Sequence, residues 1–511
     1  MSDENTFDII IIGGGATGLG VAVDAISRGY KVLLLEAYDF GKGTSSKSTK
    51  LVHGGIRYLA NLDFALVKEG LHERYYFLKN APHLAQAQTY LVPFYSLWDK
   101  LKYYVGIKLY DFLSGKLKIG ESKFLSREET LLSINTPDLQ QKNLIGSAVY
   151  YDGQFDDTRL LISLLRTYLE LGGVAYNYHQ VTQILKDNLG KANGVSVLNT
   201  LNSATHKFMA KVIINATGTL TDSILDIDEP EQKHNHVTAA QGTHLVFNKE
   251  IFDSPHALVI PKTIDDRILF VLPWHNKIIV GTTDIAVEAA EIDPQPSVSE
   301  VDFILDTLRQ YTKNKVYNSD IKAKFAGLRP LVKPKHNTNS AKISRKHEIL
   351  MSNSNLISIV GGKWTIYRLM ALDTIDFIIK HKLLENKGKS KTQELKLFGY
   401  TQEKREYPLS VYGTDYIKIL QIQKETNNFA KLHPDLPYYQ AEVIYHIRYE
   451  MAQTIEDILA RRTRALFLDA KSAFECANLT ALLMAQELDK PHAWVENQLR
   501  DFHLICKVYL P

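Results

Sequence analysis

Short apolar runs alternate with amphipathic segments along most of the chain, which is the pattern of a parallel sheet covered by helices. The first run, 7–12, consists of Phe7, Asp8 and four isoleucines, so Asp8 is its only charged residue, and a helical pattern follows at 19–28. Further buried strands are predicted at 31–35, 211–215 and 356–360. The pattern therefore predicts an α/β fold.

A glycine-rich turn joins the first strand to the first helix. Gly13, Gly15 and Gly18 have G-x-G-x-x-G spacing, and the second β-rich run ends at Glu36. Gly13 allows the tight turn, Gly15 lets the backbone approach a pyrophosphate, and Gly18 allows close helix–strand packing. The helix N-terminus offers N–H groups to phosphates, and the terminal acid can accept hydrogen bonds from ribose hydroxyls. These features predict a dinucleotide-binding unit without separating FAD from NAD.

Three later segments favour FAD. The loop 44–50 is rich in hydroxyl groups that could serve a pyrophosphate, a ribityl chain or a flavin edge. Small residues end the strand at 211–218, and the turn 361–363 places Gly-Gly before a helix, where anions or carbonyl groups can bind. The predicted cofactor-binding residues are Gly13, Gly15, Ala16, Thr17, Gly18, Glu36, Thr44, Ser45, Ser46, His53, Gly54, Val181, Ala216, Gly218, Gly362 and Lys363.

The chain is predicted to leave the nucleotide-binding domain and return to it twice. β-rich runs such as 244–247 and 268–271 suggest a substrate-binding sheet, and helical patterns at 438–459 and 471–488 indicate a separate C-terminal domain. The predicted parts are an FAD-binding domain at 1–75, 150–240 and 341–384, a substrate-binding cap domain at 76–149 and 241–340, a linker at 385–399, and a helical domain at 400–511.

Composition narrows the functional classes. The 511 residues include 60 basic and 57 acidic ones, a net charge of +3 that gives no general electrostatic case for nucleic acid. Cys476 and Cys506 are the only cysteines and the histidines form no H-E-x-x-H pattern, so no metal is expected. A hydrolase of the G-x-S-x-G type is disfavoured because that motif is missing. The polar, acidic start of the chain predicts no cleaved signal peptide.

With these motifs, the sequence resembles the FAD-dependent glycerol-3-phosphate dehydrogenases of the respiratory, quinone-linked type, within the glycine-oxidase-like flavoprotein superfamily. The resemblance spans nearly the whole chain and is most specific at 53–59, 281–284 and 327–330. Thr219 and Leu220 stand where the family usually has Pro-Trp, which changes local packing near the cofactor. The resemblance implies a Rossmann-like FAD-binding domain, an inserted α+β substrate-binding sheet domain and a C-terminal helical domain.

The resemblance also implies a reaction, in which sn-glycerol 3-phosphate is oxidised at carbon 2 to dihydroxyacetone phosphate and a hydride passes to FAD. His244, in a Gly-Thr-His motif, is the expected proton acceptor. Arg329 is expected to orient the substrate oxygen and stabilise negative charge, or else to be the proton-handling partner. Lys363 could favour the reduced, anionic flavin through its charge. The residues expected to bind substrate are Arg57, Tyr58 and Arg345, the last as a phosphate ligand.

Enzymes of this type pass electrons to a membrane quinone, so the resemblance implies a cytoplasmic protein bound peripherally to the inner face of the cell membrane. The segment 98–123 combines apolar and aromatic positions at helical spacing with six lysines, which suits a helix lying in the headgroup layer of an anionic membrane. A core helix with a solvated lysine face is the alternative. A homodimer is left open. The apolar positions are Trp98, Leu101, Val105, Leu109 and Phe112.

Three rival functions fit parts of the pattern. A glycerol-3-phosphate oxidase would share the substrate but pass electrons to dioxygen, and such enzymes usually carry an extra insertion that the sequence lacks. An amine oxidase of the same superfamily would not need several arginines for a phosphate. A flavin-binding tRNA-modifying or sensor module would need no turnover, and the near-neutral charge disfavours the tRNA version.

Overall fold

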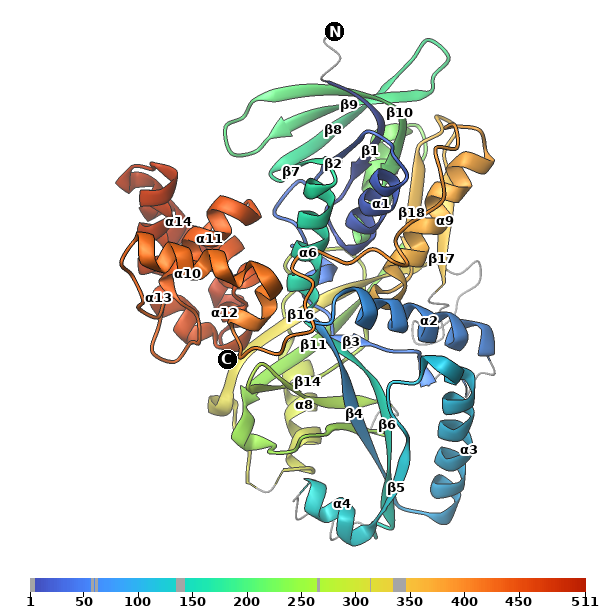
Figure 1. The fold of residues 1–511 in the computed structure, drawn as a ribbon, viewed down its shortest axis with the longest axis vertical. Coiled ribbons are helices and arrows are strands. Elements are labelled where there is room, and N and C mark those ends of the chain that lie inside the picture. Colours follow the sequence, from blue (N-terminus) through green and yellow to red (C-terminus); the bar gives the residue numbers. More distant parts are fainter. Residues whose placement is uncertain are drawn as a thin grey trace.

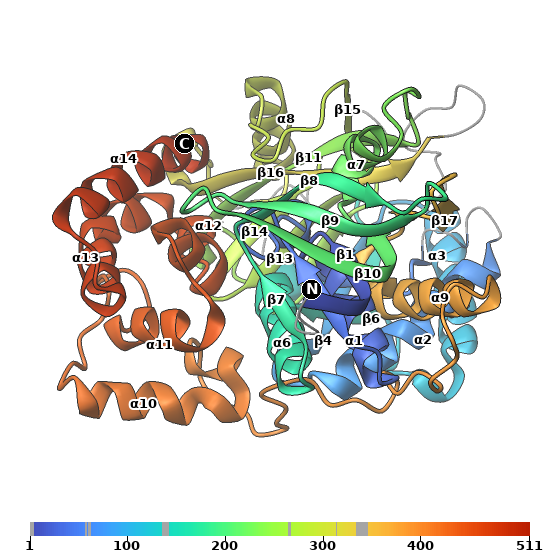
Figure 2. The same cartoon turned by 90° about the horizontal axis from the view of Figure 1, so that it is seen from above.

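Two sheets and a helical domain make up the computed structural model, which describes residues 5–56, 59, 63–134, 143–263, 267–312, 314–333 and 346–511. Figure 1 shows the first sheet at the N-terminal end of the long axis and the second sheet at the other end. The helical domain lies to one side of both sheets, as the view from above also shows (Figure 2).

The first sheet has a parallel core with the strand order β17-β18-β10-β1-β2-β7. Ile9, Ile10 and Ile11 of β1 are fully buried, because both faces of the sheet are covered. Ile9 and Ile11 pack with side chains of the helices on one face, whereas Ile10 packs with side chains of the β8–β9 ribbon on the other. α1 packs against α6 and α9. The predicted strands are confirmed, and the later ones belong to the same sheet as the first. The strands are β1 (Thr6–Ile12), β2 (Val32–Leu35), β7 (Val174–Tyr176), β10 (Thr205–Asn215), β17 (His347–Met351) and β18 (Ile357–Gly361), with the β8 (His179–Lys186) and β9 (Ala192–Asn199) ribbon paired to β10; the helices are α1 (Ala16–Ser27), α6 (Asp157–Glu170) and α9 (Tyr367–Lys380).

The second sheet is mostly antiparallel, with the order β15-β11-β14-β13-β12-β4-β6-β3, and with β16 also paired to β11. β11 and β16 form a long ladder that runs from the first sheet toward the helical domain (Figure 1). The strands are β3 (Leu51–Val52), β4 (Ala85–Phe94), β5 (Lys123–Ser126), β6 (Gly146–Phe155), β11 (Val237–Asn248), β12 (Ala257–Ile260), β13 (Leu269–Trp274), β14 (Lys277–Gly281), β15 (Ile285–Val287) and β16 (Ile321–Val332); the helices beside it are α2 (Phe64–Asn80), α3 (Leu97–Ser114), α4 (Arg127–Ile134) and α8 (Val298–Arg309).

The C-terminal domain is helical, as predicted, but one predicted helical segment is longer than the helix that forms. The helical pattern at 438–459 is broken, because α11 ends at Glu450 and Met451 has the left-handed φ of 58°. The chain then forms a wide turn over Asp457–Arg462 whose acidic and basic side chains are buried against the rest of the molecule. The helices are α10 (Tyr416–Glu425), α11 (Gln440–Glu450), α12 (Ala465–Leu468), α13 (Ala470–Leu488) and α14 (His492–Tyr509).

Candidate functional site

The turn between β1 and α1 leaves no room for side chains. A Cβ on Gly18 would lie 1.8 Å from the carbonyl oxygen of Gly13, so only glycine lets α1 pack this close to β1. A Cβ on Gly13, where φ is +106°, would lie 2.7 Å from the carbonyl oxygen of Ala216. The turn and the loop after β10 therefore meet at the carboxyl edge of the sheet, where open α/β sheets bind their ligands.

Glu36 closes one side of this turn at the end of β2. Its carboxylate accepts hydrogen bonds from the backbone N–H of Gly14 at 2.6 Å and of Tyr38 at 2.9 Å. Burial raises the pKa of Glu36, while these two backbone hydrogen bonds oppose the rise. A carboxylate has about four lone-pair sites, so the group can still accept hydrogen bonds from ribose hydroxyls. β8 begins beside it, since His179 N–H donates to the Glu36 carbonyl at 2.8 Å.

The hydroxyl loop lies across the same turn. Ser45 Oγ accepts a hydrogen bond from Ala16 N–H at 2.9 Å, and a Cβ on Gly15 would come within 3.0 Å of that hydroxyl. Thr44 Oγ1 donates to the carbonyl of Leu328 at 2.6 Å, and Trp364 Nε1 donates to the carbonyl of Ser45 at 2.9 Å. The loop thus connects the glycine turn to β16 and to the segment after β18.

The other predicted cofactor residues lie in several separate segments. Gly218 and Gly362 both have positive φ, +63° and +79°, and Lys363 starts the short helix Trp364–Ile366. His53 and Gly54 directly follow β3, and His53 N–H donates to Thr365 Oγ1 at 3.3 Å. Val181 instead buries its side chain in the apolar cluster beneath β8. Thr17 lies in the first turn of α1. The small-residue cradle, the hydroxyl loop and the carboxylate together fit an adenine dinucleotide such as FAD.

His244 and Arg329 lie on the same face of the β11–β16 ladder. His244 is opposite Phe325 and Ala240 is opposite Arg329, and residues two apart along a strand share a face. The His244 ring, 2% exposed, stacks on Phe325 with 4.8 Å between ring centroids. A Cβ on Gly242, between them, would lie 2.4 Å from Arg329 Nη2, so this glycine lets the guanidinium cross the ladder toward β14.

Fixed partners orient both groups. His244 Nε2 and Thr49 Oγ1 are 3.0 Å apart, which connects the histidine directly to the hydroxyl loop. Arg329 Nη1 donates to Asp284 Oδ1 at 3.0 Å, and Nη2 donates to Thr282 Oγ1 at 3.0 Å. The Arg329 side chain stays 22% exposed, so a substrate can reach it.

The turn that carries Thr282 and Asp284 is held by a buried acid. Glu300 accepts hydrogen bonds from Thr283 Oγ1 at 2.6 Å and from Thr243 Oγ1 at 2.9 Å. Burial would raise the pKa of Glu300, but these hydroxyl donors and the Ser297 amide lower it below its ordinary value. An ionised Glu300 therefore fixes the strand end next to His244.

The pKa of His244 lies well below its ordinary value of 6.5, first because the ring is buried and then because Lys50 and Arg329 add positive charge. A proton acceptor must be neutral, so protonation at low pH removes activity. We expect the acidic limb of the kcat/KM profile to fall well below pH 6.5, as measured in steady-state assays at fixed ionic strength. An acidic limb at or above pH 6.5 would contradict this assignment.

The sequence did not identify several residues that contact His244 and Arg329 or lie close to them. Thr49, Lys50 and Asp284 belong to segments noted only as motifs, and Phe325 had no distinguishing pattern. A hydroxyl-rich loop followed by a β-run predicts polar contacts but does not say which strand it faces. The predicted substrate residues Arg57, Tyr58 and Arg345 lie outside the described residues, and their roles stay predictions.

Comparisons with known proteins agree on one group of relatives. The profile of the FAD dependent oxidoreductase family matches residues 8–363, and that of the C-terminal domain of alpha-glycerophosphate oxidase matches 354–494. The probable mitochondrial glycerol-3-phosphate dehydrogenase of Dictyostelium discoideum is 38% identical over 506 residues, which cover 91% of this chain and 78% of that protein. The human mitochondrial glycerol-3-phosphate dehydrogenase is 36% identical and is covered over 71% of its length, with 96% of this chain aligned.

Solved structures of related flavoproteins resemble this chain as well. The glycerol-3-phosphate dehydrogenase of Bacillus halodurans, crystallised with FAD, superposes with a TM-score of 0.80 at 27% identity, covering 99% of this chain and 96% of that one. The glycine oxidase of Geobacillus kaustophilus has a TM-score of 0.56 at 16% identity over 74% of this chain and 95% of its own, a likeness of fold alone. These matches confirm the predicted flavoprotein fold and FAD as the cofactor.

Proposed function

Because the chain belongs to the FAD-dependent glycerol-3-phosphate dehydrogenase family, we propose that it oxidises sn-glycerol 3-phosphate at carbon 2 to dihydroxyacetone phosphate. The observation that carries this proposal is the pairing of a buried histidine of low pKa, His244, with a fixed guanidinium, Arg329, beside the cofactor loop. An alcohol oxidation needs both groups, because a hydroxyl proton must leave while negative charge develops on its oxygen.

His244 accepts the hydroxyl proton at Nδ1, which has no hydrogen-bond partner among the residues that the structure describes. In the tautomer with the proton on Nε2, that N–H donates to Thr49 Oγ1 and the buried Nδ1 carries the lone pair that can accept a proton. Arg329 holds the substrate oxygen and stabilises its developing charge, while Asp284 prevents the guanidinium from turning away. FAD supplies the hydride acceptor when bound.

A substrate panel tests the proposed reaction. The purified holoenzyme is assayed with an artificial electron acceptor against sn-glycerol 3-phosphate, glycerol, glycine and sarcosine. We expect turnover with the phosphate ester, and kcat/KM for glycerol lower by about 10³-fold or more because the phosphate is not held. Turnover with glycine or sarcosine instead would favour the amine oxidase alternative.

A membrane quinone is the proposed electron acceptor. The relatives named above are called dehydrogenases, which supports an acceptor other than dioxygen. Hydrogen peroxide yield in air-saturated buffer separates the two possibilities. We expect little peroxide and rapid reduction of a soluble quinone analogue, whereas one peroxide per substrate oxidised would favour the oxidase alternative.

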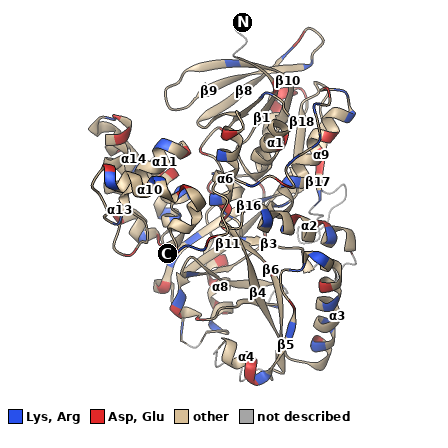
Figure 3. Ribbon diagram, viewed as in Figure 1, with Lys and Arg blue, Asp and Glu red and all other residues tan. Residues whose placement is uncertain are grey.

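α3 supports a membrane-surface location. Trp98 and Phe112 are 80% and 78% exposed, and Leu101 and Val105 are exposed beside them. The face that packs on the protein uses other residues, Ile107 and Tyr110 among them, so the exposed apolar side chains do not belong to the core. Figure 3 shows lysines along the same helix, at the end of the molecule opposite the β8–β9 ribbon. No helix among the described segments is long and apolar enough to cross a bilayer. We propose that α3 lies on an anionic membrane.

Charge reversal on α3 should weaken membrane binding. The double variant Lys100→Glu and Lys108→Glu loses about 1 kcal/mol of attraction for each lysine removed, and repulsion adds to the loss. We expect flotation with vesicles containing one-third phosphatidylglycerol to decrease at least tenfold. The matched control is Lys191→Glu with Lys207→Glu at the opposite end of the molecule, for which flotation should not change. Equal flotation of both variants would remove α3 from the account.

A further inference from the structure

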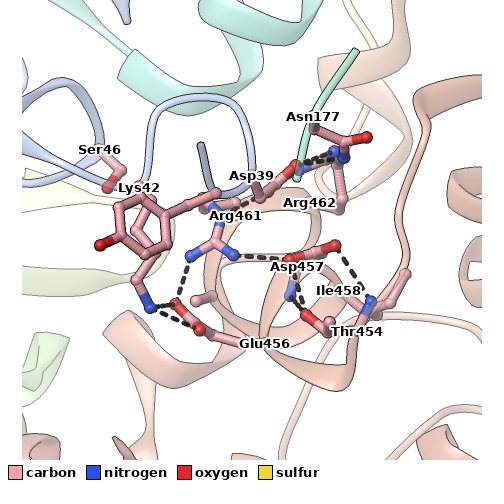
Figure 4. Close-up of polar contacts among 12 residues, drawn as sticks. Asp39, Lys42, Ser46, Asn177, Thr454, Glu456, Asp457, Ile458, Arg461 and Arg462 are labelled. Atoms are coloured by element: carbon pink, nitrogen blue, oxygen red, sulfur yellow. Dashed lines mark hydrogen bonds and ion pairs between the residues drawn. The ribbon is translucent and has the colours of Figure 1, made fainter. Parts of the chain in front are cut away.

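The helical domain meets the cofactor loop through a buried cluster of charged side chains (Figure 4). One side of the cluster is the segment 456–464, which we call the arginine turn. The other side is the loop 39–50, which contains Thr44, Ser45 and Ser46. The predicted helix at 438–459 is interrupted after Glu450, and the arginine turn follows that interruption.

Arg464 reaches the cofactor loop most directly. It is fully buried, and its Nη2 donates to the carbonyl of Ser46 at 2.9 Å. Lys50 Nζ donates to the same carbonyl at 2.9 Å, and both cations approach the buried carboxylate of Asp157. Two cationic donors on one carbonyl fix the orientation of the peptide that follows the Thr44–Ser46 turn. Only one of these donors, Lys50, comes from the loop itself.

The start of the loop is held by the same arginine turn. Arg462 forms two hydrogen bonds with the Asp39 carboxylate, at 2.7 and 2.8 Å, and Arg461 contacts the same group. Lys42 Nζ donates to Glu456 at 2.7 Å. The pKa of Asp39 is lowered to about 2, because the two arginines outweigh the effect of burial. The loop is therefore tied to the helical domain at Asp39, Lys42 and Ser46.

These contacts enclose the part of the loop that faces the glycine turn. Ser45, which accepts the Ala16 N–H at 2.9 Å, lies between the tied positions 42 and 46. Removing one partner of a buried ion pair leaves an uncompensated charge, so the loop cannot keep this geometry once the helical domain is displaced. FAD binding and docking of the helical domain are therefore thermodynamically coupled. If docking strengthens FAD binding, then bound FAD stabilises the docked helical domain by the same free energy.

We propose that the arginine turn is part of the FAD-binding apparatus, with Arg464 as a positioning residue that acts through the Ser46 carbonyl. FAD is retained only while the helical domain is docked on the cofactor loop. Arg464 does not touch the cofactor in this account, and its role differs from that of His244 and Arg329.

FAD release tests the proposal without relying on turnover. The Arg464→Gln holoenzyme is diluted, and the rise in free-flavin fluorescence gives the release rate at 25 °C. We expect release at least about tenfold faster than in the unsubstituted protein, and an intermediate rate for Arg464→Lys, which keeps one donor. The matched control is Arg448→Gln, an exposed arginine of the same domain that pairs with Glu487 and should leave the rate unchanged. Release within twofold for Arg464→Gln would overturn the proposal.

A second measurement needs no substitution and answers the case in which Arg464→Gln does not fold. Amide hydrogen exchange is compared between the FAD-loaded protein and the same protein stripped of FAD. We expect slower exchange in residues 456–468 when FAD is bound, although these residues lie outside the glycine turn and the hydroxyl loop. Equal exchange in this segment, together with slower exchange in the loop 39–50, would show that FAD binding does not depend on the helical domain.

Discussion

Arg329→Met should lower kcat/KM for sn-glycerol 3-phosphate by about 10³-fold while leaving FAD bound. The substitution removes a charged donor aimed at the oxygen where negative charge develops. Arg329 donates hydrogen bonds to Gln241 of β11 and to Thr282, Thr283 and Asp284 in the segment after β14, residues that lie outside the glycine turn and the loop 39–50. The visible spectrum of the variant should therefore match that of the unsubstituted enzyme, and steady-state kinetics give the loss.

One further variant separates the effect of the guanidinium's two-point contact from the effect of its charge, and another serves as the control. Arg329→Lys keeps the charge but loses two-point contact, so it should recover only part of the rate. Arg309→Met is the matched control, because Arg309 lies at the end of α8 and pairs with the exposed Asp306. A loss of less than tenfold for Arg329→Met, or an equal loss for Arg309→Met, would be incompatible with the proposed role.

Gly18→Ala should yield a protein without bound flavin. The added Cβ would lie 1.8 Å from the Gly13 carbonyl oxygen, far inside contact distance, and the obstacle is backbone that cannot move aside without opening the turn. Displacing α1 from β1 removes the N–H groups that the turn presents to a pyrophosphate. We expect the ratio of flavin absorbance to protein absorbance to fall at least tenfold after purification.

A glycine with free space around it provides the control. A Cβ on Gly106, in α3, would meet nothing within 4 Å, so Gly106→Ala should keep full flavin content and gain slightly in helix propensity. If Gly18→Ala purifies with a normal flavin content, the close packing at the turn does not govern cofactor binding.

The sequence alone predicts those parts of the site whose residues lie close together along the chain. The isoleucine strand, the glycine turn and Glu36 follow one another within a single β-α-β unit, so their spacing alone predicts the site that they form. The fold class, the family and FAD are confirmed by the family profiles and the relatives. The domain boundaries and the roles of individual site residues are still predictions.

The rest depends on contacts between distant segments. The helical pattern continues through Glu450 and Asp457, but α11 ends at Glu450. The segment that follows pairs Arg461 and Arg462 with Asp39, and no local pattern encodes a partner more than 400 positions away. The contact of Thr49 with His244 joins a loop to a strand 195 positions along the chain. α3 shows the converse. Its apolar spacing suited a core helix equally well, the structure leaves several of these side chains exposed, and the membrane-surface location stays a prediction.

The most direct test of the central claim is anaerobic reduction of the bound flavin. The purified protein is made oxygen-free, its visible spectrum is recorded, and sn-glycerol 3-phosphate is added without any other electron acceptor. We expect the yellow flavin band to bleach within the mixing time of a manual experiment, and glycerol or glycine at the same concentration to leave it unchanged. A flavin band that persists with sn-glycerol 3-phosphate, in protein whose flavin dithionite can reduce, would contradict the account.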